Sequence, residues 1–190
     1  MVISELHAFR NIHLSDAPAS IILINLVLVL LFLWLQTTAE EIMFRGIFLR
    51  APYGNSVPTL PKGLGFAVFS SILFMALQTA NPEVLQLSGT DVIAGAASYF
   101  FAGLGLYIAN LLIGGMECGL LLHYLNNFYC FVIISEKVTA VATPTIFFKE
   151  GETSGMWALI SVLIQYALPL IYLAVVYKRK KKEIHDINAE

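Results

Sequence analysis

The chain has 190 residues, of which 58% are hydrophobic and only 13% charged, and its formal net charge is -2. Together with a mean hydropathy of +0.77, this composition excludes an ordinary soluble domain and gives no charge signal for a nucleic-acid partner. We therefore predict an all-α, polytopic transmembrane helix bundle of about five spans, each of about 20 residues, in contact with membrane lipids.

The first 19 residues form a polar lead that lacks the features of a cleaved signal peptide, so we expect the first span to be retained. That span runs from Ser20 to Arg50. It begins as an almost continuous apolar run and then carries two carboxylates and a guanidinium, with no Pro or Gly before them. A stretch dense in Pro, Gly and Asn follows, which is typical of a turn.

Four further spans are expected at residues 62–80, 92–110, 111–135 and 155–177, with a polar turn at 81–91 and a polar loop at 136–154. The span at 92–110 is rich in Gly and Ala. Small residues let helices approach closely in lipid, so this span is expected to pack against its neighbours along much of its length. The domain plan is thus the lead at 1–19, one helical domain at 20–177 and a tail at 178–190.

The tail begins with the basic cluster 178–182, which predicts a cytoplasmic C-terminus by the positive-inside rule. Counting back through five spans places Arg50 and Lys62 on the same side. We therefore expect a multi-pass protein of the cell membrane with its N-terminus outside.

Ionisable groups at membrane depth are costly and are functional candidates for that reason. Glu41 and Arg45 are i,i+4 neighbours and are expected to pair on the helix surface. Glu40 lies about 100° around the helix axis and is expected to point elsewhere. A pair plus a spare carboxylate results.

His123 and Asn127 are also i,i+4 neighbours and are expected to offer an imidazole and an amide to a common pocket. Gln78, in the span at 62–80, could reach the same pocket. A purely structural alternative treats each of these groups as a satisfied interior residue that links helices. Taken jointly the groups favour a buried polar site, because Glu40 still needs a partner and an apolar residue would be cheaper in lipid.

These residues resemble the motifs of a known family. Glu40-Glu41-Ile-Met-Phe-Arg45 fits the EExxxR motif of the CPBP intramembrane proteases, which include the CAAX prenyl endopeptidase and Abi-like bacteriocin-processing and immunity proteins. The segment 123–127 fits the family's HxxxN motif. The segment 74–78 resembles the family's FxxxH motif, with Gln78 in place of the histidine.

The resemblance implies an intramembrane endopeptidase that cuts a peptide or protein near the membrane. Glu40 would activate water as a general base, Glu41 and Arg45 would hold the site in shape, and His123 with Asn127 would stabilise the oxyanion. Burial and dry hydrogen-bond donors suit these roles chemically.

Phe74 and Gln78 are expected to contact substrate. A glutamine cannot exchange a proton near neutral pH or replace imidazole as a zinc ligand, so the departure at Gln78 leaves activity open. No cofactor is predicted. Zinc is a less favoured alternative, because Glu40 and His123 alone fall short of the three protein ligands usual in catalytic zinc sites.

The alternative from another functional class is a catalytically inactive relative that binds a membrane peptide through the same pocket, for instance in bacteriocin self-immunity. A transporter is disfavoured, because the polar residues form a cluster and not a path.

Overall fold

The computed structural model describes residues 12–47, 60–136, 139–150 and 154–187, with side chains described from 62 in the second of these ranges and up to 179 in the last. The elements in chain order are β1 (Ile12–Leu14), α2 (Ala19–Glu41), η1 (Ile42–Gly46), α4 (Leu60–Gln78), α5 (Pro82–Leu85), α6 (Thr90–Ile113), α7 (Glu117–Phe128), η2 (Tyr129–Ile133), β2 (Ile134–Glu136), β3 (Phe147–Lys149) and α8 (Gly155–Ile187). The stretch between Arg50 and Lys62 that was predicted to turn lies outside the described residues as far as residue 59, and its last two residues belong to α4.

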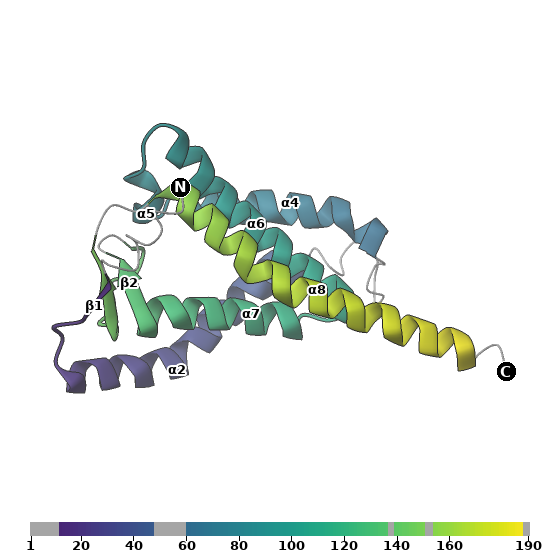
Figure 1. Cartoon of the computed structure of the whole chain (residues 1–190), viewed down its shortest axis with the longest axis horizontal. Helices are drawn as coiled ribbons and strands as arrows, with labels where there is room; N and C mark the ends of the chain where they lie inside the picture. The colour runs from purple at the N-terminus through teal and green to yellow at the C-terminus, as the bar shows by residue number, and fades with distance from the viewer. Residues whose placement is uncertain (1–11, 48–59, 137–138, 151–153, 188–190) are drawn as a thin grey trace.

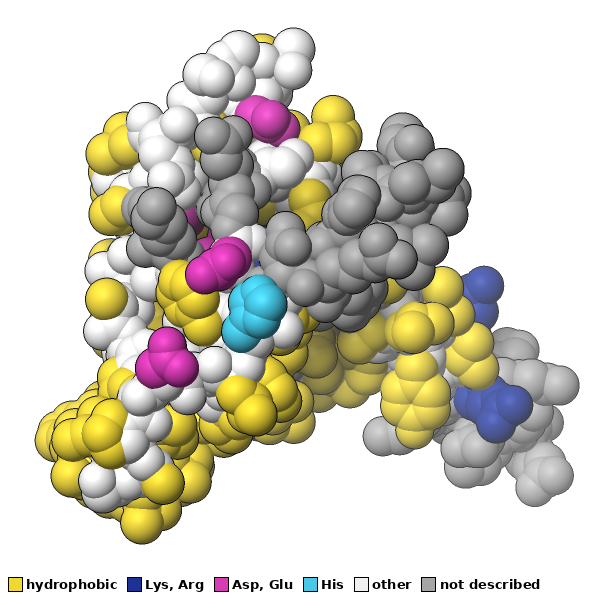
Figure 2. Space-filling view, turned by 60° about the vertical axis from the view of Figure 1, so that its left-hand side comes forward, with side chains coloured by type: hydrophobic (Ala, Val, Ile, Leu, Met, Phe, Trp, Pro, Cys, Tyr) yellow, Lys and Arg dark blue, Asp and Glu magenta, His cyan; other side chains and the backbone are white. Residues whose placement is uncertain are grey.

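The architecture is an all-α membrane helix bundle, as predicted. Three helices of the described chain are long and apolar enough to cross a membrane, at Ala19–Gly46, Thr90–Ile113 and Gly155–Arg179. A shorter apolar helix runs over Lys62–Gln78. Hydrophobic side chains dominate much of the described surface in Figure 2, in keeping with a lipid environment.

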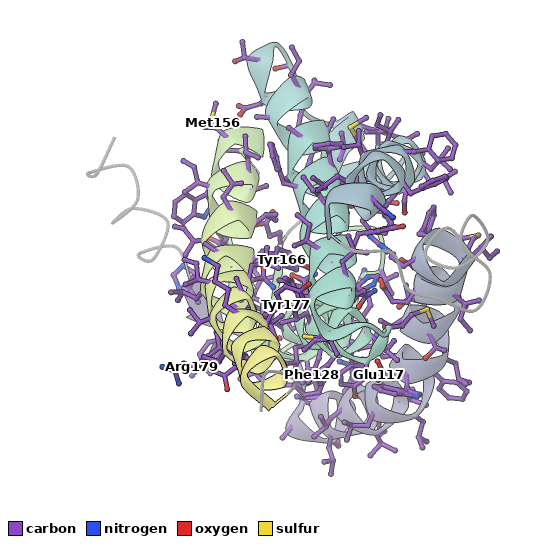
Figure 3. All side chains as sticks on the ribbon, turned by 90° about the vertical axis from the view of Figure 1, so that its right-hand side faces the viewer. Glu117, Phe128, Met156, Tyr166, Tyr177 and Arg179 are labelled. Atoms are coloured by element: carbon purple, nitrogen blue, oxygen red, sulfur yellow. The ribbon has the colours of Figure 1, made fainter. Side chains whose placement is uncertain are left out.

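α6 is the central helix of the bundle. It packs against α8 and α4 and also contacts α7, and it runs beside α8 in Figure 1. Its glycines allow the close approach: a Cβ atom on Gly105 would lie 2.9 Å from the ring of Tyr166, which points from α8 towards α6 in Figure 3. The prediction that the Gly-rich span packs tightly is confirmed.

The boundary predicted between residues 110 and 111 is wrong. α6 continues to Ile113, and the chain then turns at Gly114, whose φ of 84° lies in the left-handed region that glycine tolerates best. Gly114 and Gly115, which lie inside the span predicted at 111–135, therefore follow the end of a helix. The next helix, α7, begins only at Glu117, and the Asn110 Oδ1 atom accepts the N–H of Gly119 in its first turn at 2.7 Å.

A three-stranded sheet covers one end of the bundle. β1 and β3 lie where a polar lead and a polar loop were expected, whereas β2 begins inside the span that was predicted at 111–135, so that span does not continue as a helix to its predicted end. β3 is central, antiparallel to β1 and parallel to β2. Asn25 of α2 ties this end to the helices, because its Nδ2 atom donates to the carbonyls of Phe131 (2.7 Å) and Pro144 (3.0 Å). The one amide in the apolar run of the first span thus has a structural role.

The last helix starts at the predicted residue and ends later than predicted. The Asp91 carboxylate accepts the N–H of Met156 at 2.9 Å and the hydroxyl of Ser154 at 3.2 Å, which satisfies donors at the start of α8. The helix then continues through the basic cluster to Ile187, so the predicted tail is mostly helical. In Figure 1 this end projects beyond the bundle.

Replacing the capping amide at the α6–α7 corner tests this arrangement. Asn110→Ala leaves the Gly119 N–H without its acceptor, and we expect a loss of about 1–2 kcal/mol in the free energy of unfolding. Thr79→Ala is the control, since the described bond of that hydroxyl is an exposed, local one to the carbonyl of Ala76, three residues earlier. Equal thermal unfolding of the two variants in detergent would contradict the capping role.

Candidate active site

The EExxxR stretch lies where a helix changes its winding. α2 ends at Glu41, and Ile42–Gly46 continue as one wide π-helical turn. The Ser70 hydroxyl of α4 donates to the carbonyl of Phe44 within this turn, which fastens the turn to the neighbouring helix. Single π-turns inside α-helices frequently occur at functional sites.

Glu41 and Arg45 form the predicted pair, and both side chains are fully buried. The Arg45 Nη1 atom donates to Glu41 Oε1 at 2.8 Å. The guanidinium also lies 4.5 Å from the centre of the Phe74 ring and 5.6 Å from that of Phe44, in the range of cation–π contacts. Aromatic faces and one carboxylate therefore stabilise a cation that burial alone would disfavour.

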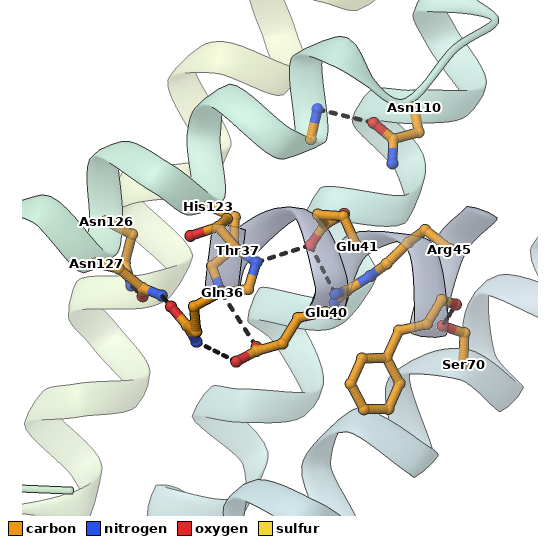
Figure 4. A network of polar contacts seen from close by, with 12 residues as sticks. Gln36, Thr37, Glu40, Glu41, Arg45, Ser70, Asn110, His123, Asn126 and Asn127 are labelled. Atoms are coloured by element: carbon orange, nitrogen blue, oxygen red, sulfur yellow. Dashed lines mark hydrogen bonds and ion pairs between the residues drawn. The ribbon is translucent and has the colours of Figure 1, made fainter. Parts of the chain in front are cut away.

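His123 of α7 connects the two glutamates. Its Nδ1 atom lies 2.8 Å from Glu41 Oε1 and its Nε2 atom lies 3.6 Å from Glu40 Oε2, as Figure 4 shows. Glu40 points away from the Glu41–Arg45 pair, as expected, but the imidazole has nitrogens on two sides and meets both glutamates at once. The geometry joins an acid–base imidazole to two carboxylates with different surroundings.

The other oxygen of Glu40 meets an amide that the sequence reading missed. Gln36, one turn earlier on α2, donates from Nε2 to Glu40 Oε1, and its own Oε1 accepts from Asn127 Nδ2 at 3.4 Å. Asn127 thus lies near the site, as predicted, but its contact is with Gln36. The i,i+4 spacing of Gln36 and Glu40 was the available signal.

The two residues predicted from α4 have different surroundings. Phe74 is buried and packs edge-on against the His123 ring, with ring centres 5.9 Å apart. Gln78, one turn later, accepts from Asn81 Nδ2 at 2.6 Å. The structure therefore brings Phe74 into the cluster, while the described contact of Gln78 is with the start of α5.

Several buried polar atoms of the cluster have no hydrogen-bond partner among the described residues. They are one oxygen of each glutamate, Glu40 Oε2 and Glu41 Oε2, and two guanidinium nitrogens of Arg45, Nε and Nη2. Unpaired buried groups are costly. The cluster therefore has unused capacity to bind water or a polar group of a ligand.

The donor set does not fit a metal ion. Within the described part of the chain, no group of three or more His, Cys, Asp or Glu side chains could hold one. Glu41 Oε1 already accepts from Arg45 and faces His123 Nδ1, and a guanidinium beside the carboxylates would repel a further cation.

Two residues that the sequence reading did not select shape the cluster from α6 and α8. Gly103 lies against Arg45, so that a Cβ atom would come within 3.2 Å of Arg45 Nη2. Tyr166 of α8 is buried and packs against Gly105 of α6, in the neighbourhood of Arg45 and Glu41. Neither is recognisable without knowing which helices are neighbours.

Comparison with known proteins matches the part of the chain that carries the three motifs to one protein family. The family described as type II CAAX prenyl endopeptidase Rce1-like matches residues 22–129, more than half of the chain and all seven predicted site residues. The chain is also 29% identical over 151 residues to the uncharacterized protein YyaK of Bacillus subtilis (strain 168), covering 78% of this chain and 46% of that protein. The chain thus spans about half the length of this relative. No solved structure matches.

Two glycine-to-alanine substitutions, one beside Arg45 and one away from it, test the packing around Arg45. In Gly103→Ala the new methyl group would lie 3.2 Å from both Arg45 Nη2 and Ser71 Cα and 3.3 Å from the Phe74 ring, and we expect a loss of about 1–3 kcal/mol in the free energy of unfolding. Gly65→Ala on α4 is the matched control, because no atom of the described residues outside its own helix backbone lies within 4 Å of its Cβ position. That variant should be neutral or more stable. Equal thermal midpoints would refute the tight packing.

Proposed function

This chain belongs to the type II CAAX prenyl endopeptidase Rce1-like family, and we propose that it hydrolyses a peptide bond of a membrane-associated substrate with a water activated by Glu40. The observation that carries this proposal is the placement of Glu40 Oε2, which is buried, has no hydrogen-bond partner among the described residues and lies 3.6 Å from His123 Nε2. A carboxylate with one oxygen held and one free suits a general base.

The spacing of these two atoms suits one bridging water. A contact beyond about 3.5 Å is too long for a direct hydrogen bond and raises the question of an intervening water. Such a water would donate to Glu40 Oε2, and its oxygen would attack the scissile carbonyl. Glu40 then takes the proton and later passes it to the leaving amine, so that atoms and charge balance.

Glu41 and Arg45 hold this arrangement. Glu41 accepts from Arg45 and faces the Nδ1 atom of His123, which fixes the ring so that Nε2 faces Glu40. Glu41 also keeps one oxygen without a hydrogen-bond partner among the described residues, but its side chain is only 1% exposed, whereas that of Glu40 is 20% exposed and so accessible to a substrate. We assign this pair a positioning role.

We propose His123 and Asn127 as the donors that stabilise the oxyanion. When His123 carries protons on both nitrogens, it donates from Nδ1 to Glu41 and from Nε2 into the site. The Asn127 amide has two N–H bonds, and its described contact with Gln36 uses one of them. Donors in a water-poor pocket strongly stabilise developing negative charge.

The substrate side of the site is proposed to involve Phe74 and Gln78. Phe74 forms an aromatic wall beside His123, and Gln78 lies one turn further along α4, where its amide can bond a peptide. The family description suggests a prenylated CAAX peptide as the first substrate to test.

A second candidate function is peptide binding without hydrolysis, as in bacteriocin self-immunity. The observation that favours it is the contact of Gln78 with Asn81 in place of a catalytic imidazole at that position. In this case the cluster would recognise a membrane peptide, and its carboxylates would contribute hydrogen bonds only.

Glu40→Gln separates these functions. With purified protein in lipid nanodiscs and a farnesylated CAAX peptide, we expect cleavage by the wild type and a fall of at least about 100-fold in kcat for the variant. Glu117→Gln is the control, an exposed carboxylate at the start of α7. Gln78→His is expected to keep or raise cleavage. Peptide binding by the wild type without product, detected by mass spectrometry, would reject the hydrolase and favour the binding function.

The protein is a multi-pass membrane protein, and we propose that its C-terminus is cytoplasmic because the basic cluster follows the last apolar segment. A reporter active only in the cytoplasm should therefore be active when fused after Glu190. Activity of a periplasmic or outer-side reporter at the same position would reverse the orientation.

A further inference from the structure

Four amide side chains form a continuous chain of hydrogen bonds that ends on Glu40. They come from three helices, α8, α7 and α2. Gln165 Nε2 donates to Asn126 Oδ1 at 2.9 Å, and Asn126 Nδ2 donates to Asn127 Oδ1 at 3.2 Å. Asn127 Nδ2 then donates to Gln36 Oε1 at 3.4 Å, and Gln36 Nε2 donates to Glu40 Oε1.

Every bond in this chain points in the same direction. An ionised carboxylate only accepts hydrogen bonds, so Gln36 must turn its NH₂ group towards Glu40. Its oxygen then faces Asn127, which must donate, and the same reasoning fixes Asn126 and Gln165 in turn. Aligned amide dipoles polarise one another, and here they present their positive ends to the carboxylate.

We propose that these four amides form a directional relay that orients Glu40, with Gln36 as the positioning residue that touches the carboxylate. The relay holds Glu40 Oε1 and thereby leaves Oε2 directed towards His123. It transfers no proton, because amides do not titrate near neutral pH. This inference rests on the proposed function, in which Glu40 Oε2 receives the proton of water.

The relay differs from ordinary hydrogen bonding between helices in the direction of its bonds and in where it ends. Gln36 and Gln165 are exposed on helices whose neighbouring surface is apolar. Amides there would be expected to bond across helices as a general stabilising contact. A general contact between helices requires neither a common direction of its hydrogen bonds nor a carboxylate at its end. This series of amides has a common direction and ends on a carboxylate, and Figure 4 shows its part from Asn126 to Glu40.

The relay also gives α8 a part in the site. α8 lies outside residues 22–129, the region that carries the family match. Through Gln165 it contacts Asn126 and so reaches Glu40 by hydrogen bonds alone. The orientation of the carboxylate thus depends on the packing of α8 against the helices that carry the motifs.

The test uses the full chain in nanodiscs with the farnesylated CAAX peptide. Gln36→Met keeps the length of the side chain and removes its polar atoms, and we expect kcat to fall about tenfold to a hundredfold with little change in KM. Gln165→Met, at the far end, should lower kcat less. Asn25→Leu is the matched control on α2, since the described contacts of its amide are with backbone carbonyls near the sheet. It should lower the thermal midpoint and leave kcat of the folded protein unchanged.

Wild-type kcat in Gln36→Met, or an equal loss of kcat in Asn25→Leu, would overturn the relay. Failure of the wild type to cleave would overturn the proposed function, and the relay is then judged by thermal unfolding of Gln36→Met, Asn126→Ala and the double variant. If the double variant unfolds at the same temperature as the less stable of the two single variants, the two residues act through one connected chain. Additive losses overturn it.

Discussion

The central constraint in this protein is the burial of Glu41. A carboxylate removed from water inside an apolar bundle must be paired and hydrogen-bonded, or its desolvation would destabilise the fold. Its Oε1 atom lies 2.8 Å from both Arg45 Nη1 and His123 Nδ1. One oxygen atom therefore links the first long helix to itself and to α7, and the positions of both helices depend on it.

The buried guanidinium of Arg45 imposes requirements of its own. It lies against aromatic rings, and α4 supplies Phe74 while α6 supplies Gly103, where no larger residue fits without displacement. The glycine content of α6 thus serves two purposes, close packing against α8 and room for the cation. Stability and site geometry are coupled, since α4 and α6 pack against each other and both contact Arg45.

Glu40 is held differently from Glu41. One of its oxygens accepts from Gln36, and the other faces the Nε2 atom of His123 across a gap that suits a water. Adjacent residues of one helix therefore have distinct environments, one closed by a cation and one open on one side. That asymmetry is the physical basis for assigning a positioning role to one carboxylate and chemistry to the other.

Sequence alone determined the membrane class, the helical architecture and the pairing of Glu41 with Arg45, because hydropathy and i,i+4 spacing are local properties of the chain. It also marked His123 and Phe74 as site residues through motifs. It did not select Gln36, although the i,i+4 spacing to Glu40 was available, because the contact of Gln36 with Asn127 arises only where α7 lies beside α2. The contact of Gln78 with Asn81 and the turn at Gly114 are local features that span boundaries drawn from hydropathy did not reveal. The strands pair segments from opposite ends of the chain, and only the tertiary structure decided them.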